Sequence, residues 1–93
     1  VPLRLAERAV RLMEIGEDAT AMGNPHAASD GYCAGTMLYA AALAAMANVR
    51  INAASLKDEA AGAALVASCD ELRATADALL QQIEEAFLLR LAS

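Results

Sequence analysis

Polar side chains gather at both ends of an uncharged stretch in the middle of this chain. They are Asn24, His26, Ser29 and Asp30 before the stretch, and Asn48, Arg50, Asn52 and Lys57 after it. No Asp, Glu, Lys or Arg lies between Asp30 and Arg50. These two groups are the only dense clusters of reactive side chains in the sequence, so any chemistry is expected there.

The first cluster could transfer protons. His26 can act as a general acid or base near neutral pH, and Asp30 can serve as its partner or as a separate carboxylate. The same residues also suit a plain helix start, with Asn24 or Ser29 as the N-cap and Asp30 at the positive end of the helix dipole. Physics alone leaves both interpretations open.

The second cluster could bind an anionic heterocycle. Arg50 and Lys57 are cations that hold carboxylates, whereas the side-chain amides of Asn48 and Asn52 both donate and accept hydrogen bonds. The alternative is an ordinary helix end, where Arg50 complements the negative pole of the dipole. This alternative also stays open.

Three helices are expected to position these clusters, at about residues 2–22, 28–51 and 56–91. Gly23 and Pro25 separate the first two, and Ser55 with Asp58 resembles a capping box before the third. No strand pattern is present, so the fold class is all-α, and the short loops predict an antiparallel bundle. The uncharged second helix is expected to be buried on nearly every face.

Apolar spacing predicts which helix faces pack. In the first helix the expected stripe is Leu5, Ala9, Leu12, Met13 and Gly16. In the third, steps of four and three give a coiled-coil-like seam, formed by Leu65, Cys69, Leu72, Ala76, Leu79, Ile83 and Ala86. The third helix is the longest, so its end is expected to overhang, leaving Phe87, Leu88 and Leu91 for oligomerisation or for missing helices to cover.

Composition excludes several classes of function. With 93 residues and a net charge of −5, the chain is expected to be one helical domain that binds neither nucleic acid nor an anionic membrane. Residues 31–49 are too poor in Leu, Ile and Phe to predict a membrane span. Cys33 and Cys69 are expected as buried, reduced thiols of a cytoplasmic protein, and with one His they form no zinc site.

The two clusters cannot meet within one chain if the second helix is straight. At 1.5 Å per residue, about 30 Å separates Asp30 from Arg50. A second chain or a broken helix could bring them together.

The order of several sequence blocks resembles the cyclodeaminase/cyclohydrolase family. This family includes the cyclodeaminase domain of formiminotransferase-cyclodeaminase and bacterial methenyltetrahydrofolate cyclohydrolases. The blocks are Val1-Pro2-Leu3, Gly23-Asn24-Pro25, Ser29-Asp30, Asn48-Val49-Arg50-Ile51-Asn52 and Ser55-Leu56-Lys57-Asp58. The chain lacks the Gly-Gly-Gly-Ser segment of the family's first helices, so the resemblance implies the C-terminal part of a longer domain.

The resemblance implies a dimer that binds a reduced folate near its subunit contacts, with a tetrahydrofolate derivative as substrate and no metal. The implied reaction is the cyclodeamination of 5-formimino-tetrahydrofolate to 5,10-methenyl-tetrahydrofolate, or hydrolysis of the methenyl bridge. Asp30 would transfer protons, assisted by His26, although His26 departs from the family's pattern. The implied substrate-binding residues are Asn24, Ser29, Asn48, Arg50, Asn52 and Lys57. The alternative is a non-catalytic helical oligomerisation module.

Overall fold

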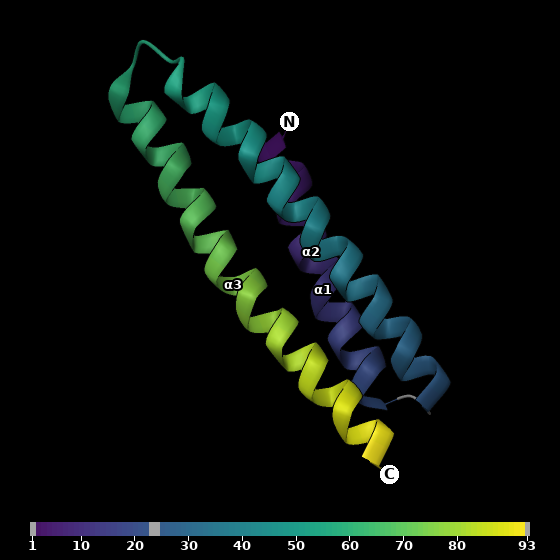
Figure 1. The fold of residues 1–93 in the computed structure, drawn as a ribbon. Coiled ribbons are helices and arrows are strands. Elements are labelled where there is room, and N and C mark those ends of the chain that lie inside the picture. The colour runs from purple at the N-terminus through teal and green to yellow at the C-terminus, as the bar shows by residue number, and fades with distance from the viewer. Residues whose placement is uncertain (1, 23–24, 93) are drawn as a thin grey trace.

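Three helices form an elongated bundle in the computed structural model, which describes residues 2–22 and 25–92 (Figure 1). They are α1 (Pro2–Met22), α2 (Pro25–Ala54) and α3 (Glu59–Ala92). No strand occurs in these ranges. Each helix packs against both others, and the Cα atoms span 54 × 17 × 14 Å. The all-α class and the antiparallel order are therefore confirmed.

The ends of α2 and α3 differ from the sequence prediction by a few residues. Proline is favoured in the first turn of a helix, where its missing N–H costs nothing, and α2 begins at Pro25 and continues to Ala54. Ser29 consequently lies inside α2 and cannot be its N-cap, while Asn24 lies outside the described residues. The predicted capping box is also wrong. Asp58 is the N-cap of α3, because its Oδ1 accepts a 3.1 Å hydrogen bond from the N–H of Ala61.

The buried stripe of α1 is rotated from the predicted one. Ala9 and Met13 are buried as expected, but Leu5 is 57% exposed and Leu12 is 50% exposed. The core side of α1 instead consists of Ala6, Ala9, Val10, Met13 and Thr20. On this side the alanines let α1 approach α2 closely and Val10 and Met13 supply the larger buried side chains, whereas Leu5 and Leu12 remain on the outer side.

The prediction that α2 is buried on nearly every face is wrong. One side packs inward, through residues such as Ala42, Met46 and Val49, but on the other side Met37 is 73% exposed and Ile51 is 68% exposed. In a three-helix bundle each helix has only two neighbours, so a large part of its surface faces outward. Alanine is tolerated on the outward-facing side of α2 because its single methyl group exposes little apolar surface to water.

The predicted seam of α3 is confirmed. Cys69, Ala76, Leu79 and Ile83 are buried in the common core, with Leu65 and Leu72 packed against it. The C-terminal end is partly covered within the chain. The Phe87 ring lies 4.9 Å from that of Tyr32, and Arg90 Nη2 donates to the carbonyl of Ala21. Leu88 and Leu91 remain exposed.

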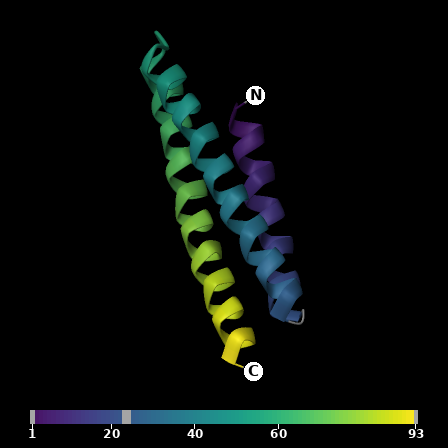
Figure 2. The same cartoon turned by 45° about the vertical axis from the view of Figure 1, so that its right-hand side comes forward.

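The larger overhang lies at the opposite end, where α2 and α3 extend beyond the start of α1 (Figures 1 and 2). Leu3, near the beginning of α1, is level with Ser68 and Leu72 of α3 and lines a depression with them. The last turn of α2, the loop and the first turns of α3 therefore form a two-helix segment.

The two cysteines have different surroundings. Cys69 is buried as predicted, but Cys33 is exposed on α2, and neither is in a disulfide. By length and composition, His26–Ala54 is the one described helical segment that could cross a membrane, a test that core helices of soluble proteins also pass.

Candidate functional site

The first polar cluster lies at the start of α2. His26, Ser29 and Asp30 are all exposed there. Asp30 is in the second turn of the helix, and His26 lies one turn before it on the same side. The structure therefore keeps His26 and Asp30 as neighbours on an accessible surface, which is the arrangement that proton transfer to a bound molecule requires.

The register of α2 places two asparagines on the same side as Asp30. Asn48 follows Asp30 by eighteen residues, which is five helical turns, and Asn52 follows one turn later. Both are exposed. Asn48 Nδ2 donates a 3.4 Å hydrogen bond to the carbonyl of Ala44, so its amide oxygen remains available to a ligand. The outer side of α2 thus has a polar pair at each end.

Arg50 lies on the opposite side of α2 from Asn48 and Asn52. Residues two apart do not share a helix face, and Arg50 points toward α3, where its Nη2 lies 2.8 Å from Oδ1 of Asp70. The second cluster predicted from the sequence is therefore split between two surfaces. Within one chain, the structure brings Arg50 together with neither asparagine nor with Asp30.

A depression of about 320 Å³ lies beside Arg50 at the two-helix end. It is lined by Arg50 and Ala53 of α2, by Leu56 of the loop, and by Glu59, Gly62 and Val66 of α3. Lys57 is exposed in the same loop, between Leu56 and Glu59. Arg50 and Glu59 are thus the charged residues that line this partly apolar depression, and Lys57 adds a second cation on the neighbouring loop.

Side-chain contacts that the sequence analysis missed connect α2 to α3. Three acidic residues spaced by seven along α3 each meet a residue of α2. Asp70 pairs with Arg50, Asp77 accepts a 2.6 Å hydrogen bond from Tyr39 Oη, and Glu84 accepts a 3.5 Å bond from Tyr32 Oη. These contacts could have been predicted from the sequence, because each of the three acids directly follows a residue of the α3 seam.

The middle contact has perturbed electrostatics. The hydrogen bond from Tyr39, together with Arg73, lowers the pKa of Asp77 below its ordinary value. The same bond raises the pKa of Tyr39. Arg73 Nε lies 3.0 Å from Asp77 Oδ1, and its guanidinium lies 6.0 Å from the Tyr39 ring centroid. All three residues are satisfied by one another, so this cluster is a structural contact.

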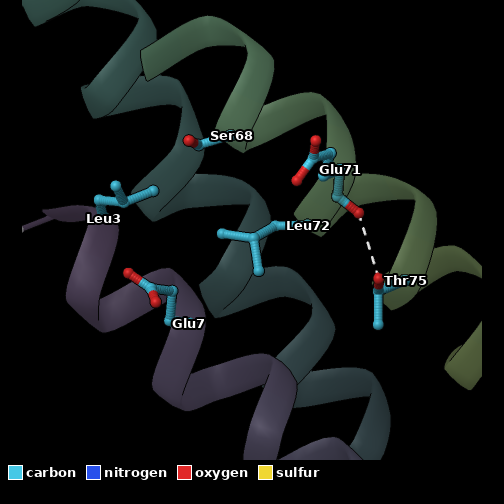
Figure 3. Close-up of a pocket in the computed structure, with 6 residues that line it drawn as sticks. All are labelled: Leu3, Glu7, Ser68, Glu71, Leu72 and Thr75. Atoms are coloured by element: carbon cyan, nitrogen blue, oxygen red, sulfur yellow. Dashed lines mark hydrogen bonds between the residues drawn. The ribbon is translucent and has the colours of Figure 1, made fainter. Parts of the chain in front are cut away.

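A second depression, of about 280 Å³, lies between α1 and α3 (Figure 3). Figure 3 shows Leu3 and Glu7 of α1 opposite Ser68 and Leu72 of α3, with Glu71 close by. Its lining contains two carboxylates and no basic side chain. An anionic ligand would be repelled there, so this depression is a poor candidate for a folate.

Within the described residues, no group of three or more His, Cys, Asp or Glu side chains could hold a metal ion.

The fold and these surfaces define an all-α helical protein whose exposed polar clusters lie on its central helix and on the adjoining loop. A family model described as formiminotransferase-cyclodeaminase matches residues 1–71. The chain therefore belongs to the formiminotransferase-cyclodeaminase family, as its sequence blocks indicated. Searches of curated proteins and of solved structures found no match.

Proposed function

We propose that this chain contributes to a cytoplasmic enzyme that acts on a reduced folate, closing 5-formimino-tetrahydrofolate to 5,10-methenyl-tetrahydrofolate or hydrolysing the methenyl bridge. The observation that carries the proposal is the register of α2. Within the segment that matches the family, His26 and Asp30 share one exposed side with Asn48 and Asn52.

In the cyclodeamination, N10 of the folate attacks the formimino carbon and the bond from that carbon to the departing nitrogen breaks. The step starts from the protonated formimino group, whose nitrogen carries two protons. N10 loses one proton and the departing amino group gains one, so that ammonia leaves and the methenyl product keeps the positive charge. Asp30 is suited to carry this proton as a solvent-accessible carboxylate, with His26 one turn away as its assistant. Asn48 and Asn52 would orient the pterin by amide hydrogen bonds.

The glutamate end of the folate would lie at Arg50 and Lys57. Arg50 borders the 320 Å³ depression, and the apolar residues beside it could contact the ligand's aromatic ring. The pterin and glutamate are at opposite ends of a folate. Because Arg50 lies on the opposite side of α2 from Asn48 and Asn52, one ligand would contact all three only by passing around the end of α2 at the loop.

Two copies would complete the site. His26 and Asn52 are equally far from residue 39, and so are Asp30 and Asn48. An antiparallel pair of α2 helices whose outer sides meet level with residue 39 would therefore place Asp30 of one chain opposite Asn48 of the other, twice; the Tyr39 side chain itself faces α3. The side chains between them on this side are Ala34, Ala41 and Ala44, which permit a close helix approach, together with the exposed Met37 and Cys33. This arrangement joins clusters that are about 30 Å apart in one chain.

Turnover can be followed by the absorbance of the methenyl-folate product. We expect Asp30→Asn to slow its formation or decay by about 10²- to 10⁴-fold, the usual contribution of a general acid or base. Asp18→Asn is the matched control, because Asp18 is an exposed carboxylate on α1, and it should leave the rate unchanged. Equal rates for wild type and Asp30→Asn would remove Asp30 from the mechanism.

Calorimetric titration with 5-formyltetrahydrofolate tests the binding residues separately from catalysis. Arg50→Ala should weaken binding by about ten- to a hundredfold, the loss expected for a hydrogen bond to a charged group. Absence of saturable binding to the wild-type chain would favour the non-catalytic assembly module. Of the two surfaces that such a module would use, the α3 seam is buried within the chain, whereas the outer side of the alanine-rich α2 is exposed.

A further inference from the structure

Asp70 already occupies the guanidinium that the proposed folate carboxylate would need. Arg50 Nη2 and Asp70 Oδ1 are 2.8 Å apart, and the two side chains are 41% and 65% exposed. An ion pair this exposed contributes little to stability. Both groups are accessible to solvent, so an anionic ligand can reach the pair.

We propose that Asp70 is an internal competitor for the anionic ligand of Arg50 and sets a weak affinity for it. This inference rests on the proposed function, because it assigns the regulation of the same site. Arg50 borders the 320 Å³ depression, whereas Asp70 does not line it. A carboxylate arriving in the depression therefore meets a cation whose charge Asp70 partly neutralises from the far side. Glu59, which lines the depression, adds a repulsion that is the same in wild type and in the Asp70 variants.

The size of the effect follows from Coulomb's law. Two carboxylates that share one guanidinium lie about 5 Å apart, and in water their repulsion corresponds to roughly a three- to fivefold change in affinity. Salt screens exposed charges, so the effect should shrink at 1 M ionic strength, where the Debye length is about 3 Å.

The opposite possibility is that Asp70 holds Arg50 in the orientation that binds the ligand. One contact to a single Nη atom fixes a guanidinium poorly, whereas a bidentate pair would fix it well. The backbone of α2 already sets where Arg50 projects. Repulsion is therefore the larger expected effect, and the two roles predict opposite results.

Asp70→Asn removes the charge while the Tyr39–Asp77 and Tyr32–Glu84 contacts still connect α2 to α3. In calorimetric titrations with 5-formyltetrahydrofolate at low salt, this variant should bind about three- to fivefold more tightly than wild type. At 1 M salt the affinities of this variant and of wild type should become nearly equal. Asp70→Glu retains the charge and should show no gain.

Asp77→Asn is the matched control, because it removes one negative charge from the same helix, two turns away from Asp70. It should leave the affinity unchanged. Equal or weaker binding by Asp70→Asn, or the same gain in Asp77→Asn, would overturn the competitor role while folate binding itself stands. Binding by none of the proteins, wild type included, would instead overturn the proposed function and this inference together.

Discussion

The closest approach of α1 to α2 depends on a single glycine. A Cβ atom built on Gly31 would lie 3.2 Å from Cβ and 3.3 Å from Cα of Thr20, and it would also collide with Thr20 Oγ1. Thr20 is fully buried, and its hydroxyl donates a 2.7 Å hydrogen bond to the carbonyl of Gly16. The backbone of α1 would have to move before any side chain could fit at residue 31.

Gly31→Ala should therefore lower the free energy of unfolding by about 1–3 kcal/mol, the usual cost of overpacking. Gly16→Ala is the matched control at the same crossing. Its Cβ would meet only the carbonyl oxygen of Gly31, at 4.0 Å. That variant should gain up to about 1 kcal/mol from helix propensity. Urea unfolding followed by circular dichroism measures both, and a stabilised Gly31→Ala would contradict the close approach.

The sequence was least informative about the directions of individual side chains. His26, Asp30, Asn48 and Arg50 were identified as candidates from their types, but type alone does not say which way a side chain leaves its helix. Counting by 3.6 residues would have placed Asp30 with Asn48 and separated Arg50 from both. The Arg50–Asp70 contact required the relative position of two helices, which spacing within one helix does not supply.

Among the elements, α3 was predicted best. Its seam follows from alternating steps of four and three over three heptads, and such a pattern leaves little freedom in which side is buried. The stripe of α1 was predicted less well. Leucine is a strong indicator of burial, but in α1 the core side is formed by alanines together with Val10 and Met13. The presence of leucine alone therefore did not determine which side of α1 packs inward.

The start of α3 depends on Asp58, and this gives a test at the scale of one element. Asp58→Ala should lower the free energy of unfolding by about 0.5–2 kcal/mol, because the N–H of Ala61 loses its side-chain acceptor. Ser55→Ala should cost less, since Ser55 Oγ contacts the carbonyl of Asn52 and no amide of α3. A larger loss of stability in Ser55→Ala than in Asp58→Ala would instead support Ser55 as the N-cap, as the predicted capping box requires.

The whole molecule exposes more surface than its size predicts. A compact protein of 9.6 kDa has about 5,100 Å² of accessible surface, whereas this chain exposes 5926 Å². The excess of about 800 Å² is close to what one partner buries in a standard protein interface. The high proportion of apolar residues led to the expectation of further burial, and the exposed outer side of α2 is the surface that such burial would cover.

The proposed α2 pair can be tested with the native Cys33, because it is exposed while Cys69 is buried. In an antiparallel pair whose outer sides meet level with residue 39, the two Cys33 residues lie about 18 Å apart along the helix axis. Spin labels on Cys33 should therefore report one short, well-defined distance in a dimer confirmed by light scattering. Monomers by light scattering, or a dimer in which the Cys33 labels are far apart, would rule out this pairing.

The two-helix end has a consequence for local stability. Beyond the start of α1, the last turn of α2 and the first turns of α3 support only each other, with Gly62 packed against the carbonyl of Ala53. Segments with few buried contacts open with less free energy than the core. Lys57 therefore belongs to a part of the molecule that opens more readily than the core, and Arg50 lies at its edge, paired with Asp70. For a ligand that contacts both residues, part of the binding free energy would be used to order the two-helix end.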